Sequence, residues 1–188
     1  MIILNAITGA SCLPLAIRFL RVLGKLGVER HLIISKSAQC VQRFDQKTEI
    51  VDWMELSEVL YPVDDVAAAV CSGSYEIDGM VIVPCSMNTL AHIANGLEHN
   101  AITRAASVNL KQQKKVVLVP RETPLSLIHI KNMYQAKLAG CSIVLPLLGF
   151  YYRPETIDDI LDHICGKVLE LLNIPHNLYT PWQEIDRN

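Results

Sequence analysis

Short apolar runs that alternate with segments of helical periodicity are the feature that most constrains how this chain can fold. The runs predict five strands, over Ile2–Ile7, His31–Ser35, Gly79–Cys85, Lys115–Pro120 and Cys141–Leu145. Nearly continuous apolar runs are typical of parallel strands that are covered on both faces. Strands that alternate with helices form right-handed βαβ units. The sequence therefore predicts an α/β fold with a central parallel sheet between layers of helices.

The segments between the runs carry helical patterns. In Thr156–Leu172, apolar residues recur at i, i+3, i+4 spacing, which predicts an amphipathic helix. The other predicted helices are Leu13–Leu26, Ala38–Asp45, Asn88–Gly96, Thr103–Gln113 and Pro124–Ala139. With 188 residues and no repeat or linker, we expect one domain over residues 1–188. Its polar tail, about residues 173–188, is expected to wrap a neighbouring element or another subunit.

Composition and charge argue against several classes of protein. Although 51% of the residues are hydrophobic, no stretch approaches the roughly 20 apolar residues of a membrane-spanning helix. A net charge of −2 argues against a nucleic-acid partner. The six cysteines form no C-x-x-C pair and the six histidines show no ligand spacing, so we expect no metal site. Dispersed cysteines without a secretory leader predict reduced thiols in a cytoplasmic protein.

Polar residues follow four of the predicted strands. The first strand leads into Thr8–Ser11, where Gly9 permits a tight turn and Ser11 can cap a helix or donate to a phosphate. Ser35, Ser86–Thr89 and Arg121 follow the next three strands. Ligands of parallel sheets bind beyond the carboxyl ends of the strands, at helix N-termini. Helix capping explains any one of these residues, whereas their coincidence favours a site for an anionic cofactor. Neither a G-x-G-x-x-G motif nor a P-loop is present.

Two further segments concentrate charge or aromatic residues. Arg104 and Lys111 lie seven residues apart, hence on one face of a predicted helix. The loop Gly149–Pro154 is aromatic and precedes the last helix. Taken singly, a solvated helix face and a packing loop explain these two segments. The histidines at 92, 99, 129 and 163 have no acid or nucleophile at a telling spacing, so we expect ordinary polar histidines.

In their order along the chain, these segments resemble the UbiX family, the flavin prenyltransferases associated with phenolic and aromatic-acid decarboxylases. The resemblance runs from Ile3 to about Trp182, nearly the whole chain. The segments that carry it are Ser72–Tyr75, Gly79–Leu90, Arg104–Ala106, Leu110–Lys111, Val119–Leu125, Ile128–Ile130, Asn132–Met133, Phe150–Tyr151 and Pro154.

The resemblance implies a flavodoxin-like or Rossmann-like three-layer sandwich that assembles into trimers and then dodecamers, with FMN held between subunits. The implied activity is metal-free transfer of a dimethylallyl group from dimethylallyl phosphate to N5 and C6 of reduced FMN. The product, prenylated FMN, would be delivered to a UbiD-type decarboxylase.

The resemblance also implies roles for individual residues. The flavin would be bound by Gly9, Ala10, Ser11, Ser35, Ser86, Met87, Asn88, Thr89, Arg104 and Arg121. The phosphate of the second substrate would be gripped by Lys111, Arg121, Tyr151 and Lys167. The residues implied in catalysis are Ser11, Asp45, Lys111 and Glu122. Several positions depart from the family. Cys12 stands for a glycine, Asp45 for a glutamate and Lys167 for an arginine, Leu145, Leu147 and Leu148 stand where prolines are usual, and Val66 corresponds to a tryptophan of some members.

Two other functions stay open at this stage. Flavin-dependent cysteine decarboxylases share the fold and the Pro-x-Ser-x-Asn-Thr turn, which here reads from Pro84 to Thr89. Those enzymes also need a histidine upstream of the turn, and none occurs between Val41 and Pro84. A non-catalytic carrier that binds FMN and hands it on is the second alternative, suggested by the departures at Cys12, Asp45 and Lys167.

Overall fold

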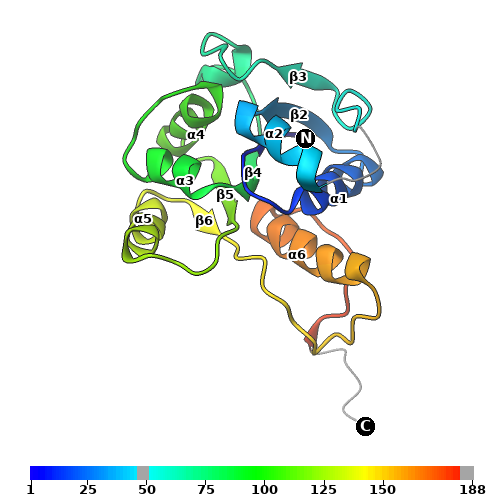
Figure 1. Cartoon of the computed structure of the whole chain (residues 1–188). Helices are drawn as coiled ribbons and strands as arrows, with labels where there is room; N and C mark the ends of the chain where they lie inside the picture. The colour runs from blue at the N-terminus through cyan, green and yellow to red at the C-terminus, as the bar shows by residue number, and fades with distance from the viewer. Residues whose placement is uncertain (46–50, 183–188) are drawn as a thin grey trace.

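The computed structural model describes residues 1–45 and 51–182 and is built around one parallel sheet (Figure 1). Six strands lie in the order β3-β2-β1-β4-β5-β6, and every neighbouring pair is parallel. The strands are β1 Ile2–Ile7, β2 Glu29–Ile34, β3 Val59–Tyr61, β4 Gly79–Cys85, β5 Lys115–Pro120 and β6 Ser142–Ile143. This strand order is that of the Rossmann-type doubly wound sheet, so the predicted fold class is confirmed.

In the described residues, six helices and one 3₁₀ turn lie between the strands or, for the last helix, after them. They are α1 Leu13–Lys25, α2 Lys36–Asp45, the 3₁₀ turn Ala69–Cys71, α3 Met87–Ala94, α4 Ala101–Lys111, α5 Leu127–Leu138 and α6 Ile157–Leu172. All predicted helices and strands are present, and three of the strands have the predicted bounds. The last strand is shorter than predicted because only Ser142 and Ile143 pair with β5.

Two hydrophobic cores cover the two faces of the sheet, because side chains alternate along each strand. Ile3 and Ile7 of β1 point into one core, with α1 and α6, and Leu4 and Ala6 point into the other, with α3 and α4. Figure 1 shows these helices on opposite sides of the sheet. Residues of β1, β4 and β5 are buried on both faces, which explains their unbroken apolar runs.

Helix α6 is fixed to α1 and is covered by the tail. Arg18 of α1 donates two hydrogen bonds, at 2.7 and 2.6 Å, to the Asp162 carboxylate of α6. Beyond α6 the chain turns back, and Ile174 is buried. His176 and Tyr179 of the tail contact Glu170 of α6 in the same chain, and the expectation that the tail wraps a neighbouring element or another subunit stays a prediction. Residues 183–188 lie outside the described part.

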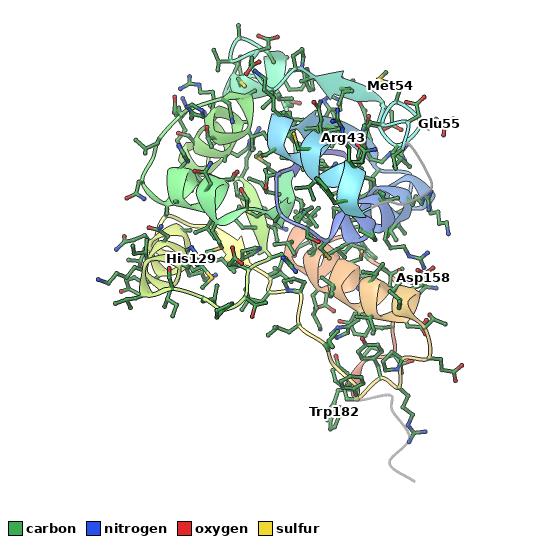
Figure 2. All side chains as sticks on the ribbon, viewed as in Figure 1. Arg43, Met54, Glu55, His129, Asp158 and Trp182 are labelled. Carbon is green, nitrogen blue, oxygen red and sulfur yellow. The ribbon has the colours of Figure 1, made fainter. Side chains whose placement is uncertain are left out.

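Helix α5 leaves most of its apolar side chains in solvent. Of its residues only Ala136 is buried, while Leu127, Ile128 and Leu138 are each more than 60% exposed. Figure 2 shows side chains standing out from this helix beside His129. Among the described helices, none is long and apolar enough to cross a membrane.

Candidate active site at the carboxyl edge of the sheet

The strand order reverses between β1 and β4, which defines the switch point of the sheet. Ligands of doubly wound folds bind in the crevice outside the carboxyl ends of the strands at this point. Here the loop Thr8–Ser11 leaves β1 and the turn Ser86–Thr89 leaves β4. We call these two loops, with the start of α2, the switch-point edge.

Thr8 joins the two loops of the switch-point edge. Its side chain is 1% exposed, and its hydroxyl donates to the Pro84 carbonyl at 2.9 Å and accepts from the Ser86 amide at 2.7 Å. The Thr8 amide donates to the same carbonyl at 3.2 Å. A single buried residue therefore fixes the start of the Ser86 turn relative to the end of β1.

Gly9 is required by close packing. A Cβ at this position would lie 2.5 Å from both Cβ and Oγ of Ser37, at the start of α2. Ser37 Oγ lies 3.0 Å from Ser35 Oγ, which accepts from the Ala38 amide at 3.1 Å and caps α2. The predicted flavin residues Gly9 and Ser35 are therefore neighbours, and the glycine serves the packing of the two loops.

Cys12 adopts a backbone conformation that suits glycine. Its φ is 100° and its ψ 34°, immediately before α1 begins at Leu13. L-residues tolerate φ of about +50 to +70° in the left-handed region, so φ 100° is strained for a cysteine. Between Gly9 and Cys12, Ala10 is buried and Ser11 is half-buried.

The Ser86 turn presents the N-terminus of α3. Ser86 Oγ accepts from the Thr89 amide at 3.2 Å and lies 3.1 Å from the Thr89 hydroxyl. Met87 is buried, whereas Asn88 is exposed. Free backbone amides and hydroxyls at the starts of α2 and α3 are groups that bind anions, so this donor set fits a phosphate-bearing cofactor.

Arg121 and Glu122 extend the same edge beyond β5. The Arg121 amide donates to the Cys85 carbonyl at 3.3 Å, next to the Ser86 turn. Both side chains are exposed, and the Glu122 carboxylate accepts from the Thr123 amide at 3.0 Å. A cation and a carboxylate therefore flank the switch point.

Lys111 lies near the amino ends of the strands, opposite the switch-point edge. It is the last residue of α4, just before β5 begins at Lys115, whereas Arg121 follows the end of β5. The six residues of β5 span about 20 Å at roughly 3.3 Å per residue. Within one chain, Lys111 and Arg121 therefore cannot grip the same phosphate.

Arg104 shares its surroundings with Lys111, as their spacing predicts. Arg104 Nη1 lies 2.5 Å from the Glu98 carboxylate. Hydrogen bonds from Ser107 and Arg104 lower the pKa of Glu98, and the charge of Lys111 lowers it further. Lys111 also lines a cavity of about 360 Å³ between the end of α3, α4 and Ala139. Asp45 ends α2, and its side chain lies outside the described residues.

Tyr151 contacts His163 of α6, and Lys167 lies one helical turn further along the same side of the helix. The Tyr151 hydroxyl lies 2.7 Å from His163 Nε2, and His163 precedes Lys167 by one helical turn. Lys167 Nζ lies 3.1 Å from the Glu170 carboxylate and 4.8 Å from the centre of the Tyr179 ring. We call His163, Lys167 and Glu170, with the side chains that contact them, the α6 face.

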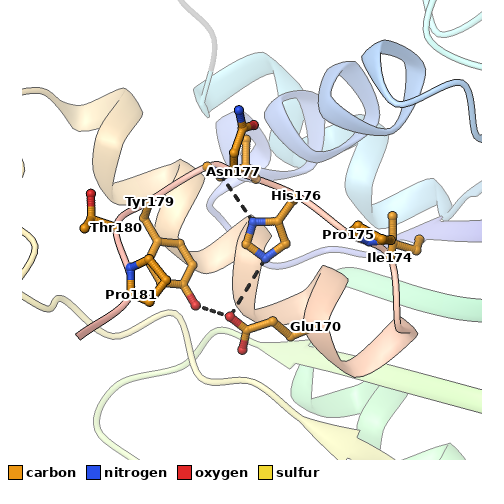
Figure 3. A pocket seen from close by; sticks show the side chains of 9 residues that line it. Glu170, Ile174, Pro175, His176, Asn177, Tyr179, Thr180 and Pro181 are labelled. Carbon is orange, nitrogen blue, oxygen red and sulfur yellow. Dashed lines mark hydrogen bonds and ion pairs between the residues drawn. The ribbon is translucent and has the colours of Figure 1, made fainter. Parts of the chain in front are cut away.

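The tail completes the α6 face (Figure 3). The Tyr179 hydroxyl donates to the Glu170 carboxylate, and His176 Nε2 lies 3.8 Å from it. These residues line a cavity of about 690 Å³ between the end of α6 and the tail. A Cβ on Gly166 would lie 2.5 Å from the Tyr179 ring, so the tail docks on α6 because residue 166 has no side chain.

Four contributors to these two regions were not predicted from the sequence as site residues: Thr8, His163, Glu170 and Tyr179. The sequence alone indicates only an ordinary polar histidine at position 163. The available signal was the series His163, Lys167 and Glu170, which places three polar residues on one side of an amphipathic helix. The bonds to Tyr151 and Tyr179 depend on the tertiary fold.

The cysteines are structural in this fold. Cys40, Cys71, Cys85, Cys141 and Cys165 have free thiols, and four of these five are buried. Burial raises the pKa of the Cys141 thiol to about 11 and raises those of Cys71, Cys85 and Cys165, so the buried thiols stay protonated. In the described part of the chain, no three histidine, cysteine, aspartate or glutamate residues are grouped so that they could hold a metal ion.

Comparison with known proteins agrees with the geometry. The model of the family described as Flavoprotein matches residues 1–169. The flavin prenyltransferase UbiX of Methanothermobacter thermautotrophicus is 42% identical over 183 residues, which cover 97% of this chain and 95% of the relative.

Solved structures show the same similarity in three dimensions. AnUbiX, crystallised with FMN and dimethylallyl pyrophosphate, superposes with a TM-score of 0.94 at 38% identity, covering 98% of both chains. A dodecameric FMN-dependent UbiX-like decarboxylase from Escherichia coli O157:H7 superposes with a TM-score of 0.92 at 39% identity, covering 97% of this chain and 100% of that one. The peptidyl-cysteine decarboxylase EpiD is similar in fold alone, with a TM-score of 0.63 at 16% identity over 92% of this chain and 98% of that one.

Proposed function

The chain belongs to the flavoprotein family and, within it, to the UbiX-type flavin prenyltransferases, and on this basis we propose the reaction that it catalyses. It transfers the dimethylallyl group of dimethylallyl phosphate to N5 and C6 of reduced FMN and releases phosphate. The observation that carries the proposal is the similarity over 98% of the chain to a UbiX protein that was crystallised with FMN and dimethylallyl pyrophosphate.

The switch-point edge would hold the flavin. Its hydroxyls and helix N-termini fit an anionic cofactor, and Thr8 fixes their relative positions. The residues assigned to the flavin are Gly9, Ala10, Ser11, Ser35, Ser86, Met87, Asn88, Thr89, Arg104 and Arg121. When bound, reduced FMN supplies the electron-rich ring atoms that accept the dimethylallyl group.

Lys111, Arg121, Tyr151 and Lys167 would hold the phosphate of the second substrate. A leaving phosphate that no metal ion binds must be stabilised by fixed cations and hydrogen-bond donors, which lysine, arginine and a phenol provide. Aromatic side chains stabilise a developing allylic cation, and a dry site keeps water from quenching it. Ser11, Asp45 and Glu122 would position the reactants or move protons near them.

The proposed site needs more than one copy of the chain. Lys111 lies near the amino end of β5 and Arg121 follows its carboxyl end, so a phosphate that touches both must lie between subunits. The exposed apolar residues of α5 and of the 145–150 loop offer a surface for such contacts. A homo-oligomer, built as trimers that form a dodecamer, satisfies both requirements, and the UbiX-like protein from E. coli O157:H7 is dodecameric.

We further propose that the product serves a UbiD-type decarboxylase and that the reaction takes place in the cytoplasm. Free cysteines are typical of a reducing compartment, which supports the second assignment. The first rests on the family alone.

The direct test is to incubate the purified protein with reduced FMN and dimethylallyl phosphate. We expect a flavin that is heavier by one dimethylallyl group and one phosphate released per flavin. Lys111→Ala should lower turnover by about 100-fold or more, since fixed charges at a leaving group contribute effects of this size, and should spare much of the flavin binding. Lys25→Ala, an exposed lysine at the end of α1, is the matched control and should change neither.

The same assay separates the alternatives. A non-catalytic carrier would bind FMN, give no new flavin mass and be insensitive to Lys111→Ala. A cysteine decarboxylase would release CO₂ from a peptide that ends in cysteine, without dimethylallyl phosphate. Supplying dimethylallyl diphosphate in place of the monophosphate shows which donor is used.

A further inference from the structure

His163 lies at the centre of the α6 face. Its Nε2 is 2.7 Å from the Tyr151 hydroxyl, and its ring stacks on Tyr152 with centroids 4.4 Å apart and an interplanar angle of 13°. Tyr179 of the tail packs edge-on against the same ring at 4.7 Å. Three aromatic side chains from two segments therefore hold one imidazole in a fixed orientation.

The imidazole also lies beside a cation. Lys167 follows His163 by four residues and Glu170 by seven, so all three side chains share one side of α6. The groups that face His163 are thus Lys167 and Glu170 from α6, Tyr151 and Tyr152 from the loop before it, and Tyr179 from the tail. Burial lowers the pKa of His163, the Lys167 ammonium lowers it further, and Glu170 opposes these effects in part.

In the hydrogen bond between Tyr151 and His163, either residue can be the donor. A neutral imidazole whose Nε2 has no hydrogen accepts from the Tyr151 hydroxyl, so that the phenol proton is not available to another acceptor. An imidazolium donates from Nε2 to the phenol oxygen, and the phenol proton is then free to point elsewhere. The protonation state of His163 thus decides where Tyr151 donates.

We propose that His163 is a positioning residue for Tyr151, and that it takes up a proton from solvent when a phosphate group binds beside Lys167, which directs the phenol proton to the phosphate. The inference rests on the proposed function, in which Tyr151 and Lys167 hold the substrate phosphate. A phosphate dianion next to this face favours the charged form of the imidazole, because opposite charges within about 4–6 Å stabilise ionisation. No covalent bond changes, and the proton comes from the buffer.

Calorimetry on the FMN-loaded protein, with inorganic phosphate as the probe, tests the proposal. At pH 7, titrations in two buffers of different ionisation enthalpy give the net number of protons exchanged on binding, and the wild type should take up more protons than His163→Gln. His163→Gln, which keeps a polar group but does not titrate, should bind phosphate within a few-fold of the wild type with reduced uptake. His163→Phe keeps a ring but cannot bond to the Tyr151 hydroxyl, so the phenol is no longer held in place to donate to the phosphate. It should bind phosphate about 10-fold more weakly, since a hydrogen bond to a charged group is worth at least that factor.

Controls separate the role of His163 from that of the site. His99→Gln removes an exposed histidine and should leave both binding and proton uptake unchanged. Inorganic phosphate also exchanges protons, because binding of the dianion near pH 7 releases protons from the monoanion. This release persists in His163→Gln, so only the difference from the wild type is attributed to His163. In a proton NMR titration, the pKa of His163 should rise when phosphate is added.

Two results would overturn the proposal: one concerns only the role of His163, and the other concerns the phosphate site as a whole. If Tyr151→Phe and Lys167→Ala weaken phosphate binding but His163→Phe does not, or uptake is unchanged in His163→Gln, the role of His163 is wrong and the phosphate site stands. If Tyr151→Phe and Lys167→Ala bind phosphate as the wild type does, the assignment of the phosphate site itself is wrong.

Discussion

The switch-point edge and the α6 face are constructed in opposite ways. At the switch-point edge, small residues and backbone groups make the contacts, and Thr8 is almost fully buried. On the α6 face, the contacts are made by long and aromatic side chains from a loop, a helix and the tail, and most of these side chains are partly exposed. The first region belongs to the core of the sheet, whereas the second depends on a segment docked from outside.

This difference matches the ligands proposed for each region. A flavin and its phosphate are recognised by amides and hydroxyls whose positions are set by strand ends and helix caps. A leaving phosphate requires charged groups whose positions and protonation can respond to it. Substitutions in the switch-point edge should therefore lower both the stability of the fold and the affinity for the cofactor. Substitutions on the α6 face should lower turnover with little loss of stability.

Thr8→Val should give the largest effect, because it breaks the link between the two loops of the switch-point edge. The substitution keeps the shape of the side chain but leaves the Ser86 amide without its partner. We expect the free energy of unfolding to fall by about 1–3 kcal/mol, the cost of an unsatisfied buried group, and FMN to bind at least roughly 10-fold more weakly.

Chemical denaturation and flavin titration measure these two effects. Ser57→Ala is the matched control, since the Ser57 hydroxyl is also buried and donates to a backbone carbonyl, that of Trp53, at 2.8 Å. It should lower stability while leaving FMN binding intact. Unchanged FMN affinity in Thr8→Val would contradict the assigned role of the switch-point edge.

Gly166→Ala should release the tail from the α6 face. The added methyl group would meet the Tyr179 ring at 2.5 Å and the His176 ring at 2.8 Å. Because alanine favours a helix over glycine by about 1 kcal/mol, the free energy of unfolding should change little. Turnover should fall by roughly 10-fold, which corresponds to about 1.4 kcal/mol in the activation free energy.

Chymotrypsin cleavage after Tyr179 reports tail release and should become faster in Gly166→Ala. Gly149→Ala is the control, because its methyl group would meet Tyr152 and Tyr151 at the ordinary contact distances of 3.4 and 3.5 Å. Loss of FMN binding in Gly166→Ala, with a tail as resistant as in the wild type, would show that the two regions are not separate.

Cys12→Gly should give the smallest effect and the opposite sign. Glycine tolerates φ 100°, so relief of strain should raise the free energy of unfolding by up to about 1 kcal/mol. Gln113→Gly is the comparison, since φ 57° at Gln113 lies inside the allowed left-handed region and should gain less. Thermal denaturation of both variants measures the difference, and an equal gain would show that Cys12 is unstrained.

The sequence predicts the centre of this fold well and its periphery less well. The apolar runs of β1, β4 and β5 are buried on both faces, so their bounds follow from hydrophobicity alone. Strand β3 was not predicted because its three residues lie at the sheet edge, where two are partly buried and Leu60 is exposed, which leaves no periodic pattern.

The same distinction holds for the two site regions. Ser35 and Ser86 were found because a helix cap is a local pattern of a few residues. The link from Thr8 to Pro84 spans 76 positions, and the bond from Tyr151 to His163 joins a loop to a helix. Such pairs form only when the chain has folded, so no local sequence pattern joins the two partners.

The placement of Lys111 and Arg121 at opposite ends of β5 has a genetic consequence. If each reaction centre takes these residues from different subunits, a variant damaged at one of them and a variant damaged at the other can complement each other. Co-expressed Lys111→Ala and Arg121→Ala chains would form mixed particles in which some junctions join two undamaged edges. The activity of the mixed particles, compared with that of each variant alone, would then measure how many junctions are intact.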